Sequence, residues 1–201
     1  MQINPGSLDL VTLSNCYQSH CDVTLMPSPR QVVDEAAAVV SRAAESDTAV
    51  YGVNTGFGKL ASTRIDARDT ATLQRNLILS HCCGVGDPLE DSVVRLVLVL
   101  KVNSLARGAS GVRWRTVQQI VDMLNAGIMP VIPSQGSVGA SGDLAPLAHM
   151  SAAMMGEGQV RVNGEVLPAS DALARAGIEP LQLGPKEGLG LINGTQVSTA
   201  L

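Results

Sequence analysis

The sequence predicts a mainly α-helical protein, and two observations carry that prediction. Apolar residues recur every three or four positions through several long stretches, which is the spacing of a helix that buries one face. Aromatic residues make up only 2% of a chain that is 45% hydrophobic, so the core must be aliphatic, and such side chains favour close helix–helix packing. Residues 159–167 are the exception, because two alternating runs flank Asn163-Gly164, the strongest short signal for a β-hairpin.

The remaining elements follow from glycine and proline positions. Residues 1–29 read as irregular, with a short strand or helical turn over residues 8–13. Residues 50–60 form a glycine-rich loop, and the prolines of residues 130–133 favour extended chain. The predicted helices are 31–44, 66–82, 91–106, 111–125, 141–155, 169–176 and 185–201. The last apolar pattern is still running at Leu201, so we expect the N-terminal part of a longer protein.

Charge and hydropathy exclude two classes of function. The net charge is −4 and no basic run is present, which argues against a nucleic-acid partner. The longest apolar run, Leu96–Leu100, is far too short to span a bilayer, and the N-terminus lacks the pattern of a signal peptide. We therefore expect a soluble, cytoplasmic protein with no membrane partner. The cysteines fit neither a redox nor a zinc motif and are predicted to be small buried residues: Cys16, Cys21, Cys82 and Cys83.

The run from Gly136 to Leu147 contains Ala140-Ser141-Gly142, a tripeptide that can become a carbon electrophile without an added cofactor. The Gly142 amide nitrogen can attack the Ala140 carbonyl carbon, because glycine has no Cβ and reaches strained backbone geometry readily. Loss of water from the ring and from Ser141 then leaves an exocyclic methylidene. None of the twenty side chains is a good carbon electrophile, so a protein that needs one must acquire or build it.

Four sequence blocks in a fixed order together resemble the aromatic amino acid ammonia-lyases. The blocks are residues 51–58 (Tyr-Gly-Val-Asn-Thr-Gly-Phe-Gly), 79–81 (Leu-Ser-His), 136–150 around Ala-Ser-Gly, and 193–196 (Asn-Gly-Thr-Gln). The resemblance covers residues 8–201 and is closest to the members that act on histidine. It implies an aspartase/fumarase-like helical fold, in which residues 1–110 form an N-terminal cap-like helical domain and residues 111–201 begin the central helical domain.

The resemblance also implies roles for individual residues. Ala140-Ser141-Gly142 is expected to form a methylidene-imidazolone (MIO) autocatalytically, with no external cofactor and no metal. Tyr51 is the expected catalytic base, which removes a proton from the β-carbon of the substrate. His81 is expected to lie in the substrate pocket and to help select the substrate side chain. Asn193 is expected to face the electrophile, where it binds the substrate or polarises the ring.

Structural interpretations stay open beside these roles. Tyr51 also reads as a half-buried structural tyrosine, His81 as a capping residue at a helix end, and Asn193 as a turn residue. Asp143 is a supporting residue that either holds the loop during ring closure or provides charge at a helix N-terminus. Gly58 supports the flexible loop that carries the tyrosine.

Two other kinds of glycine-rich site are excluded, because residues at required positions of their motifs do not match. Gly58-Lys59 does not complete a phosphate-binding P-loop, because Val53 and Leu60 stand where that motif needs a glycine and a hydroxyl residue. Residues 139–143 read Gly-Ala-Ser-Gly-Asp and so lack the Gly-x-Ser-x-Gly order of a serine-hydrolase elbow. His149 is predicted to be a packed helix residue.

The resemblance implies an ammonia-lyase that eliminates ammonia from L-histidine to give trans-urocanate. Alternatives that use the same electrophile are a tyrosine or phenylalanine ammonia-lyase and an aminomutase, which adds ammonia back at the β-carbon. A non-enzymatic alternative is a helical assembly module. The family resemblance also suggests a homotetramer whose active sites combine several subunits, so residues 1–201 alone are expected to be inactive.

Overall fold

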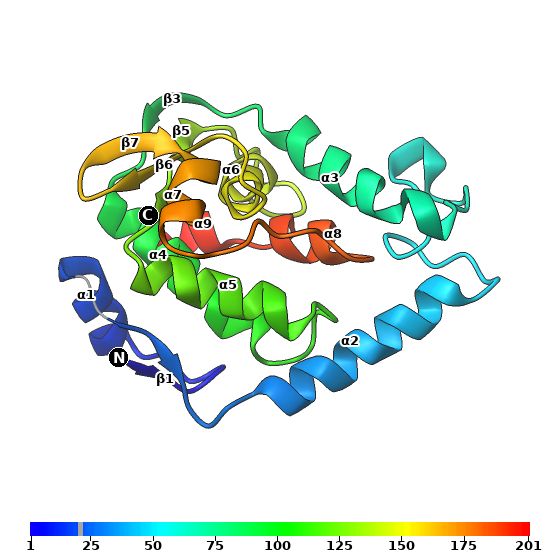
Figure 1. Cartoon of the computed structure of the whole chain (residues 1–201), viewed down its shortest axis with the longest axis horizontal. Coiled ribbons are helices and arrows are strands. Elements are labelled where there is room, and N and C mark those ends of the chain that lie inside the picture. Colours follow the sequence, from blue (N-terminus) through cyan, green and yellow to red (C-terminus); the bar gives the residue numbers. More distant parts are fainter. Residues whose placement is uncertain (20–21) are drawn as a thin grey trace.

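In the computed structural model, which describes residues 1–19 and 22–201, helix α6 (Leu144–Met154) lies in the middle of the other elements (Figure 1). Nearly all of its residues are buried, because its sequence is apolar on every side and such a helix belongs in a core. Pro146 stands in the first turn, where its missing N–H breaks no intrahelical hydrogen bond. The loop before α6, which carries Ser141, is therefore attached directly to the core.

Helices α3 (Thr70–His81), α8 (Glu187–Ile192) and α9 (Gln196–Ala200) pack against α6. Helix α9 also packs along α4 (Asp91–Leu105), whose valines and leucines recur at helical spacing and are buried. The fold thus brings the last residues of the chain against two helices that precede them by 40 or more positions in the sequence.

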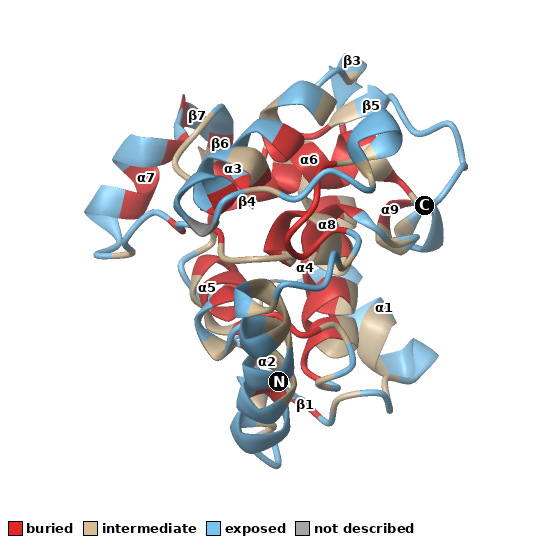
Figure 2. Ribbon diagram, turned by 90° about the vertical axis from the view of Figure 1, so that its right-hand side faces the viewer, coloured by how far each residue is buried: buried red, intermediate tan, exposed pale blue. Residues whose placement is uncertain are grey.

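The remaining helices surround this centre. Helices α1 (Leu10–Gln18) and α5 (Trp114–Asn125) both pack against α4, and α2 (Arg30–Glu45) packs against α5. Figure 2 shows the buried residues concentrated on α4, α5 and α6, whereas α2 is largely exposed and buries only Val33. Short helical segments complete the list: the 3₁₀ turns Gly58–Leu60 and Ala67–Asp69, and helix α7 (Ala169–Arg175).

Three small sheets are present among the described residues. Strands β1 (Gln2–Ile3) and β2 (Thr24–Leu25) pair in parallel, and β3 (Val85–Pro88) and β5 (Pro133–Gln135) pair antiparallel. The third sheet has the order β4–β6–β7, all antiparallel, with bounds Met129–Pro130, Gln159–Val162 and Glu165–Pro168.

The predicted β-hairpin is confirmed in strands β6 and β7. Val162 pairs with Glu165 across a two-residue turn, and both turn residues have positive φ, 52° at Asn163 and 82° at Gly164. Asn-Gly is favoured in this turn because both positions require the left-handed region.

The predicted helices are confirmed with small shifts at their ends, apart from the last one. The single helix predicted over residues 185–201 is wrong, because α8 ends at Ile192 and α9 begins only at Gln196. Asn193 has ψ 104°, and the Gly194 carbonyl accepts a hydrogen bond from the Asp143 N–H instead of continuing the helix. Strand β3 was not predicted, because all four residues of Val85–Pro88 are exposed and the segment has no alternating apolar pattern.

The cysteine prediction holds only in part. Cys16 is buried and Cys82 is half-buried, but Cys83 is exposed, because it lies in the connection that leaves α3 for β3. Cys21 lies outside the described residues. Burial, with a contribution from the neighbouring Cys83, raises the pKa of the Cys82 thiol to about 11. In the ranges that the structure describes, no helix has both the length and the apolar character needed to cross a membrane.

Candidate active site

Ala140-Ser141-Gly142 forms a tight bend between β5 and α6. Ser141 has φ 61° and Gly142 has φ 106°, so two consecutive residues lie in the region that L side chains avoid. A Cβ at Gly142 would lie 2.6 Å from both the nitrogen and the oxygen of Gly194. Glycine is therefore required at position 142, because any side chain would displace the backbone that follows α8.

Asn193 lies directly over this bend. Its Nδ2 donates to the Ser141 carbonyl oxygen at 2.7 Å and to the Ser141 hydroxyl at 3.0 Å. The contact depends on the break after α8, since a continuing helix would commit the backbone of residues 193–195 to a different path. The structure thus brings together the two blocks that contain Ser141 and Asn193.

Asp143 also connects these two blocks, because it forms hydrogen bonds both with the loop before α6 and with residues that follow α8. Its buried carboxylate accepts hydrogen bonds from the Ser137 hydroxyl at 2.8 Å, the Ser198 N–H at 2.8 Å and the Ser198 hydroxyl. The Asp143 N–H donates to the Gly194 carbonyl at 2.7 Å. Burial by itself raises the pKa of Asp143, but the hydrogen bonds from Ser198 and Ser137 outweigh it and hold that pKa below its usual value.

The Asp143 contacts bear on a question that the sequence left open, namely whether this residue holds the loop or provides charge at the start of α6. Asp143 stands at the start of α6 but makes no side-chain cap there, and its carboxylate is turned toward Ser137 and Ser198. Asp143 therefore serves the loop and α9, and its contacts fix the position of the bend at Ser141.

Tyr51 opens the loop that follows α2. Its side chain is 55% exposed, and its ring meets Phe57 edge-on at a centroid distance of 5.8 Å. Buried Asn54 organises the loop: its Nδ2 donates to the carbonyls of Ala43, Ser46 and Thr48, and its Oδ1 accepts from the Val50 N–H. Hydrogen bonds thus hold the base of the loop to the end of α2, while Tyr51 is exposed.

Helix α8 connects the tyrosine loop to the bend at Ser141. A Cβ at Gly52 would lie 2.8 Å from Leu189 Cδ2, so this loop packs closely on α8, whose last residue precedes Asn193. No hydrogen bond among the described residues joins Tyr51 or Gly58 to Ser141. Gly58 has φ 57° and open space around it, which accounts for glycine at that position.

His81 ends α3 and is not joined to Ser141 by any contact in the described part of the chain. Its Nδ1 lies 2.7 Å from the Leu77 carbonyl oxygen, which can only accept, so Nδ1 carries a proton and donates it there. His149 is packed, as predicted: its Nε2 accepts the Gly84 N–H at 3.1 Å. Burial lowers the pKa of His149.

Glu187, at the start of α8, is a residue that sequence reasoning missed. Its buried carboxylate accepts from Arg113, from the Thr116 hydroxyl at 2.6 Å and from the Gly184 N–H at 2.7 Å. Burial by itself raises the pKa of Glu187. The hydrogen bonds from Arg113 and Thr116 outweigh that effect and keep the pKa below its usual value. This network fixes α8 against α5 and, through α8, fixes Asn193.

Three other supporting residues also went unrecognised: Asn54, Ser137 and Ser198. Asn54 lies inside the Tyr51–Gly58 block, and a polar residue between two glycines was a usable signal for a loop-organising side chain. The two serines carried no signal, because their common partner Asp143 is known only from the fold. Among the described residues, no group of three histidine, cysteine or acidic side chains could hold a metal ion.

The fold and the loop around Ser141 define the class of this protein. The chain belongs to the aromatic amino acid lyase family, whose model matches residues 8–201.

One curated relative of known activity is similar over the whole of this chain. A histidine ammonia-lyase from Roseobacter denitrificans is 60% identical over 200 residues, which is 100% of this chain and 39% of that protein. The chain thus spans about two fifths of the length of that relative.

Solved structures of the family match across 100% of this chain. An ergothionase from Treponema denticola has a TM-score of 0.95 at 32% identity, with 40% of that chain covered. A histidine ammonia-lyase from Trypanosoma cruzi has a TM-score of 0.88 at 37% identity, with 40% covered. A phenylalanine aminomutase from Pantoea agglomerans has a TM-score of 0.93 at 31% identity, with 39% covered. The fold is therefore shared by lyases and aminomutases alike.

Proposed function

We propose that the whole protein is an ammonia-lyase that converts L-histidine to trans-urocanate and ammonia. The observation that carries the proposal is the pair of hydrogen bonds from Asn193 to Ser141 within the Ala-Ser-Gly bend. The preference for histidine rests on the 60% identity to a histidine ammonia-lyase, against 31% identity to a phenylalanine aminomutase.

The residues of the bend fit an MIO group formed from Ala140-Ser141-Gly142. The bend is already tight, with positive φ at Ser141 and Gly142, and position 142 has no room for a Cβ. The group supplies a carbon electrophile that turns the substrate's amino group into a better leaving group. The Ser141 carbonyl would become the ring carbonyl, so the Nδ2 of Asn193 lies 2.7 Å from the oxygen on which negative charge would develop.

The other residues act on the substrate. Tyr51 takes the β-proton, the C–H electron pair becomes the carbon–carbon double bond, and the C–N bond breaks to release ammonia. Since Nδ1 of His81 donates to the Leu77 carbonyl, Nε2 is the ring nitrogen left to meet the imidazole or phenol of a substrate side chain. Since Tyr51 and His81 are not joined to Ser141 within this stretch of chain, we propose that neighbouring subunits complete the site.

Intact-mass spectrometry and product analysis test the function. Full-length protein should be lighter than its sequence by about 36 Da, the mass of the two waters lost in this backbone modification, and Ser141→Ala should restore the mass and abolish turnover. Incubation with L-histidine should give urocanate. Cinnamate or coumarate from another amino acid would overturn the histidine assignment, and a β-amino acid product would identify an aminomutase. An unmodified mass in active enzyme would overturn the electrophile.

We further propose that the whole protein is a cytoplasmic homotetramer. In it, residues 1–110 would form the cap-like domain and residues 111–201 would begin the central domain. Residues 1–201 alone would lack turnover, because positioning by the remaining helices and subunits supplies much of a rate enhancement, roughly 7–11 kcal/mol in favourable cases. Light scattering on the full-length protein and rate measurements on the 201-residue chain test these statements.

A further inference from the structure

The connection that leaves α3 for β3, residues 82–84, lies against helix α6. The Gly84 N–H donates to Nε2 of His149 at 3.1 Å, across 65 positions of sequence. His149 belongs to α6, the helix that begins directly after the Ala-Ser-Gly bend. Helix α3 itself also packs against α6. One side chain therefore ties the stretch that follows His81 to the helix that follows Ser141.

Gly84 is packed too closely for a side chain. A Cβ at this position would lie 3.1 Å from His149 Nε2 and 3.2 Å from Pro133 Cβ. A Cβ at Gly136, where the run that leads into the bend begins, would lie 3.1 Å from the Cα of Gly84. The connection after α3 thus touches both the segment that enters the bend and the helix that leaves it.

His81 is held by this same connection. Its Nδ1 donates to the Leu77 carbonyl at 2.7 Å, and its own carbonyl accepts the Cys83 N–H at 2.8 Å. The first hydrogen bond sets the direction of the ring, and the second fixes the backbone between the ring and Gly84. Since Gly84 is bound to His149, a change at His149 would be passed along this short stretch to the His81 ring.

His149 holds Gly84 as a hydrogen-bond acceptor. Its Nε2 accepts the Gly84 N–H, so that nitrogen carries no proton. The ring is half-buried, and burial lowers the pKa of His149, which favours this neutral form. A backbone N–H that is withdrawn from water needs such an acceptor, because leaving it without a partner is costly.

We propose that His149 is a positioning residue for substrate selection, which sets the separation between the His81 ring and the electrophile. This inference rests on the proposed function, in which His81 meets the substrate side chain and Ser141 forms part of the electrophile. The two groups act on opposite ends of one small amino acid, so their separation must be right to within about 0.5 Å. They do not touch each other among the described residues, and His149 provides a hydrogen-bonded link through α6.

Two variants of the full-length protein differ only in whether they keep this link. The amide oxygen of glutamine stands as many bonds from Cβ as Nε2 of histidine does, whereas that of asparagine stands one bond closer. His149→Gln should therefore keep the hydrogen bond to Gly84, and His149→Asn should lose it. We expect His149→Asn to raise KM for L-histidine about ten-fold with little change in kcat, because the bound substrate and the transition state both use the contact with His81. His149→Gln should remain close to wild type.

Isothermal titration calorimetry with two matched acids gives a measurement that does not depend on turnover. The acids 3-(imidazol-4-yl)propanoate and 3-phenylpropanoate share a carboxylate, but only the first has ring nitrogens that can meet His81. Neither carries an amino group to add to the electrophile. His149→Asn should weaken the imidazole acid about ten-fold and leave the phenyl acid unchanged. Gly84→Ala should cause the same selective loss, because its Cβ would separate the two partners, and its φ lies outside the left-handed region.

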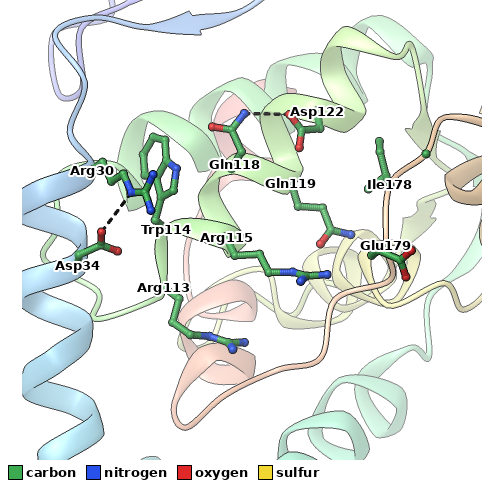
Figure 3. Close-up of a pocket in the computed structure, with 11 residues that line it drawn as sticks. Arg30, Asp34, Arg113, Trp114, Arg115, Gln118, Gln119, Asp122, Ile178 and Glu179 are labelled. Carbon is green, nitrogen blue, oxygen red and sulfur yellow. Dashed lines mark hydrogen bonds and ion pairs between the residues drawn. The ribbon is translucent and has the colours of Figure 1, made fainter.

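Two control variants should change neither KM nor the affinity for either acid. Ser151→Ala removes a buried hydroxyl of α6 that donates only to the Leu147 carbonyl within the same helix. Arg115→Ala removes an exposed side chain at the hollow beside the N-terminal end of α5, a hollow that His149 and Gly84 do not line (Figure 3).

The possible outcomes separate this inference from the proposed function. A wild-type protein that forms urocanate, together with a His149→Asn variant of unchanged KM and probe affinities, would overturn the positioning role alone. A lower kcat at unchanged KM, or equal weakening of both acids, would also overturn it and leave His149 a structural residue. If His149→Asn does not fold, the selective loss in Gly84→Ala decides. A wild-type protein that forms no urocanate would refute the proposed function and this inference together.

Discussion

The Nδ2 of Asn193 lies 2.7 Å from the carbonyl oxygen of Ser141 and 3.0 Å from its hydroxyl oxygen, across 52 positions of sequence. A single amide group therefore donates to both oxygens of the residue at the centre of the Ala-Ser-Gly bend. The geometry requires the break between α8 and α9 and the close approach of Gly142 to Gly194. The predictions below test how much each of these features contributes.

Asn193→Ala should lower kcat for ammonia release by about 10²–10³, the effect of removing one donor from a site where negative charge develops. The reason is loss of the hydrogen bond to the Ser141 carbonyl. Initial rates of product formation measure the change in kcat. Asn15→Ala, on the exposed face of α1, is the control and should leave the rate unchanged. A rate for Asn193→Ala within two-fold of wild type would rule out this role.

Gly142→Ala should prevent formation of the modified bend, whereas Gly139→Ala should permit it. Both glycines have positive φ, but a Cβ at Gly142 would lie 2.6 Å from Gly194, and one at Gly139 would meet nothing within 4 Å. The second variant carries only the cost of a left-handed alanine, about 1–2 kcal/mol. Intact mass is the measurement. Equal loss of water from both variants would show that the contact with Gly194 is unimportant.

Asp143→Asn should slow formation of the modified group, because an amide nitrogen in place of Oδ2 cannot accept the hydrogen bond from the Ser198 N–H, and a neutral oxygen holds the Ser137 and Ser198 hydroxyls less strongly than a carboxylate does. The fraction of protein with reduced mass, followed after synthesis, should fall. Since the pKa of Asp143 is held low, its stabilising contribution is present above about pH 4 and is lost as the pH falls through its folded pKa. Asp171→Asn, on exposed α7, is the matched control. Wild-type maturation in Asp143→Asn would contradict the prediction.

Glu187→Gln should destabilise the protein by about 1–3 kcal/mol, because it weakens the charge-assisted hydrogen bonds that Arg113 and Thr116 donate to this buried group. Urea unfolding measures the change. Glu157→Gln is the control, since its ion pair with Arg75 is exposed and should contribute less than about 1 kcal/mol. Equal decreases of the unfolding free energy in the two variants would show that the buried network stabilises the protein no more than the exposed ion pair.

Lys101→Met should stabilise the protein at neutral pH. Lys101 is 1% exposed, and burial lowers the pKa of its ammonium to about 7. Between about pH 7 and pH 10.5 the unfolded chain then binds more protons than the folded one, so unfolding free energy rises with pH by up to about 1.4 kcal/mol per unit. The difference between wild type and Lys101→Met should therefore shrink from pH 7 to pH 10.

Urea unfolding at several pH values measures that difference. Lys59→Met, on the exposed loop, should behave as wild type at every pH. A Lys101→Met variant that is less stable than wild type at pH 7 would mean that the ammonium has a partner in the folded protein.

Local patterns in the sequence were enough for most of the helices and for the hairpin. The repeat of valines and leucines in α4 and the Asn163-Gly164 turn are set by neighbouring residues, so periodicity and turn chemistry predict them. The electrophile at Ala140-Ser141-Gly142 stays a prediction of the same local kind, since ring closure involves only adjacent residues. The family resemblance then added the roles expected of Tyr51, His81 and Asn193.

Only the tertiary structure decided how these pieces meet. The apolar pattern of residues 185–201 favours one helix. In the structure the Asp143 N–H donates to the Gly194 carbonyl and the Asn193 side chain donates to the Ser141 carbonyl, so the helix ends before these residues. The partners of Asp143 and Glu187 lie far away in sequence and leave no local signal. Helix periodicity reports which face is buried, whereas a hydrogen bond between distant segments depends on how whole elements pack, and that is fixed only when the chain folds.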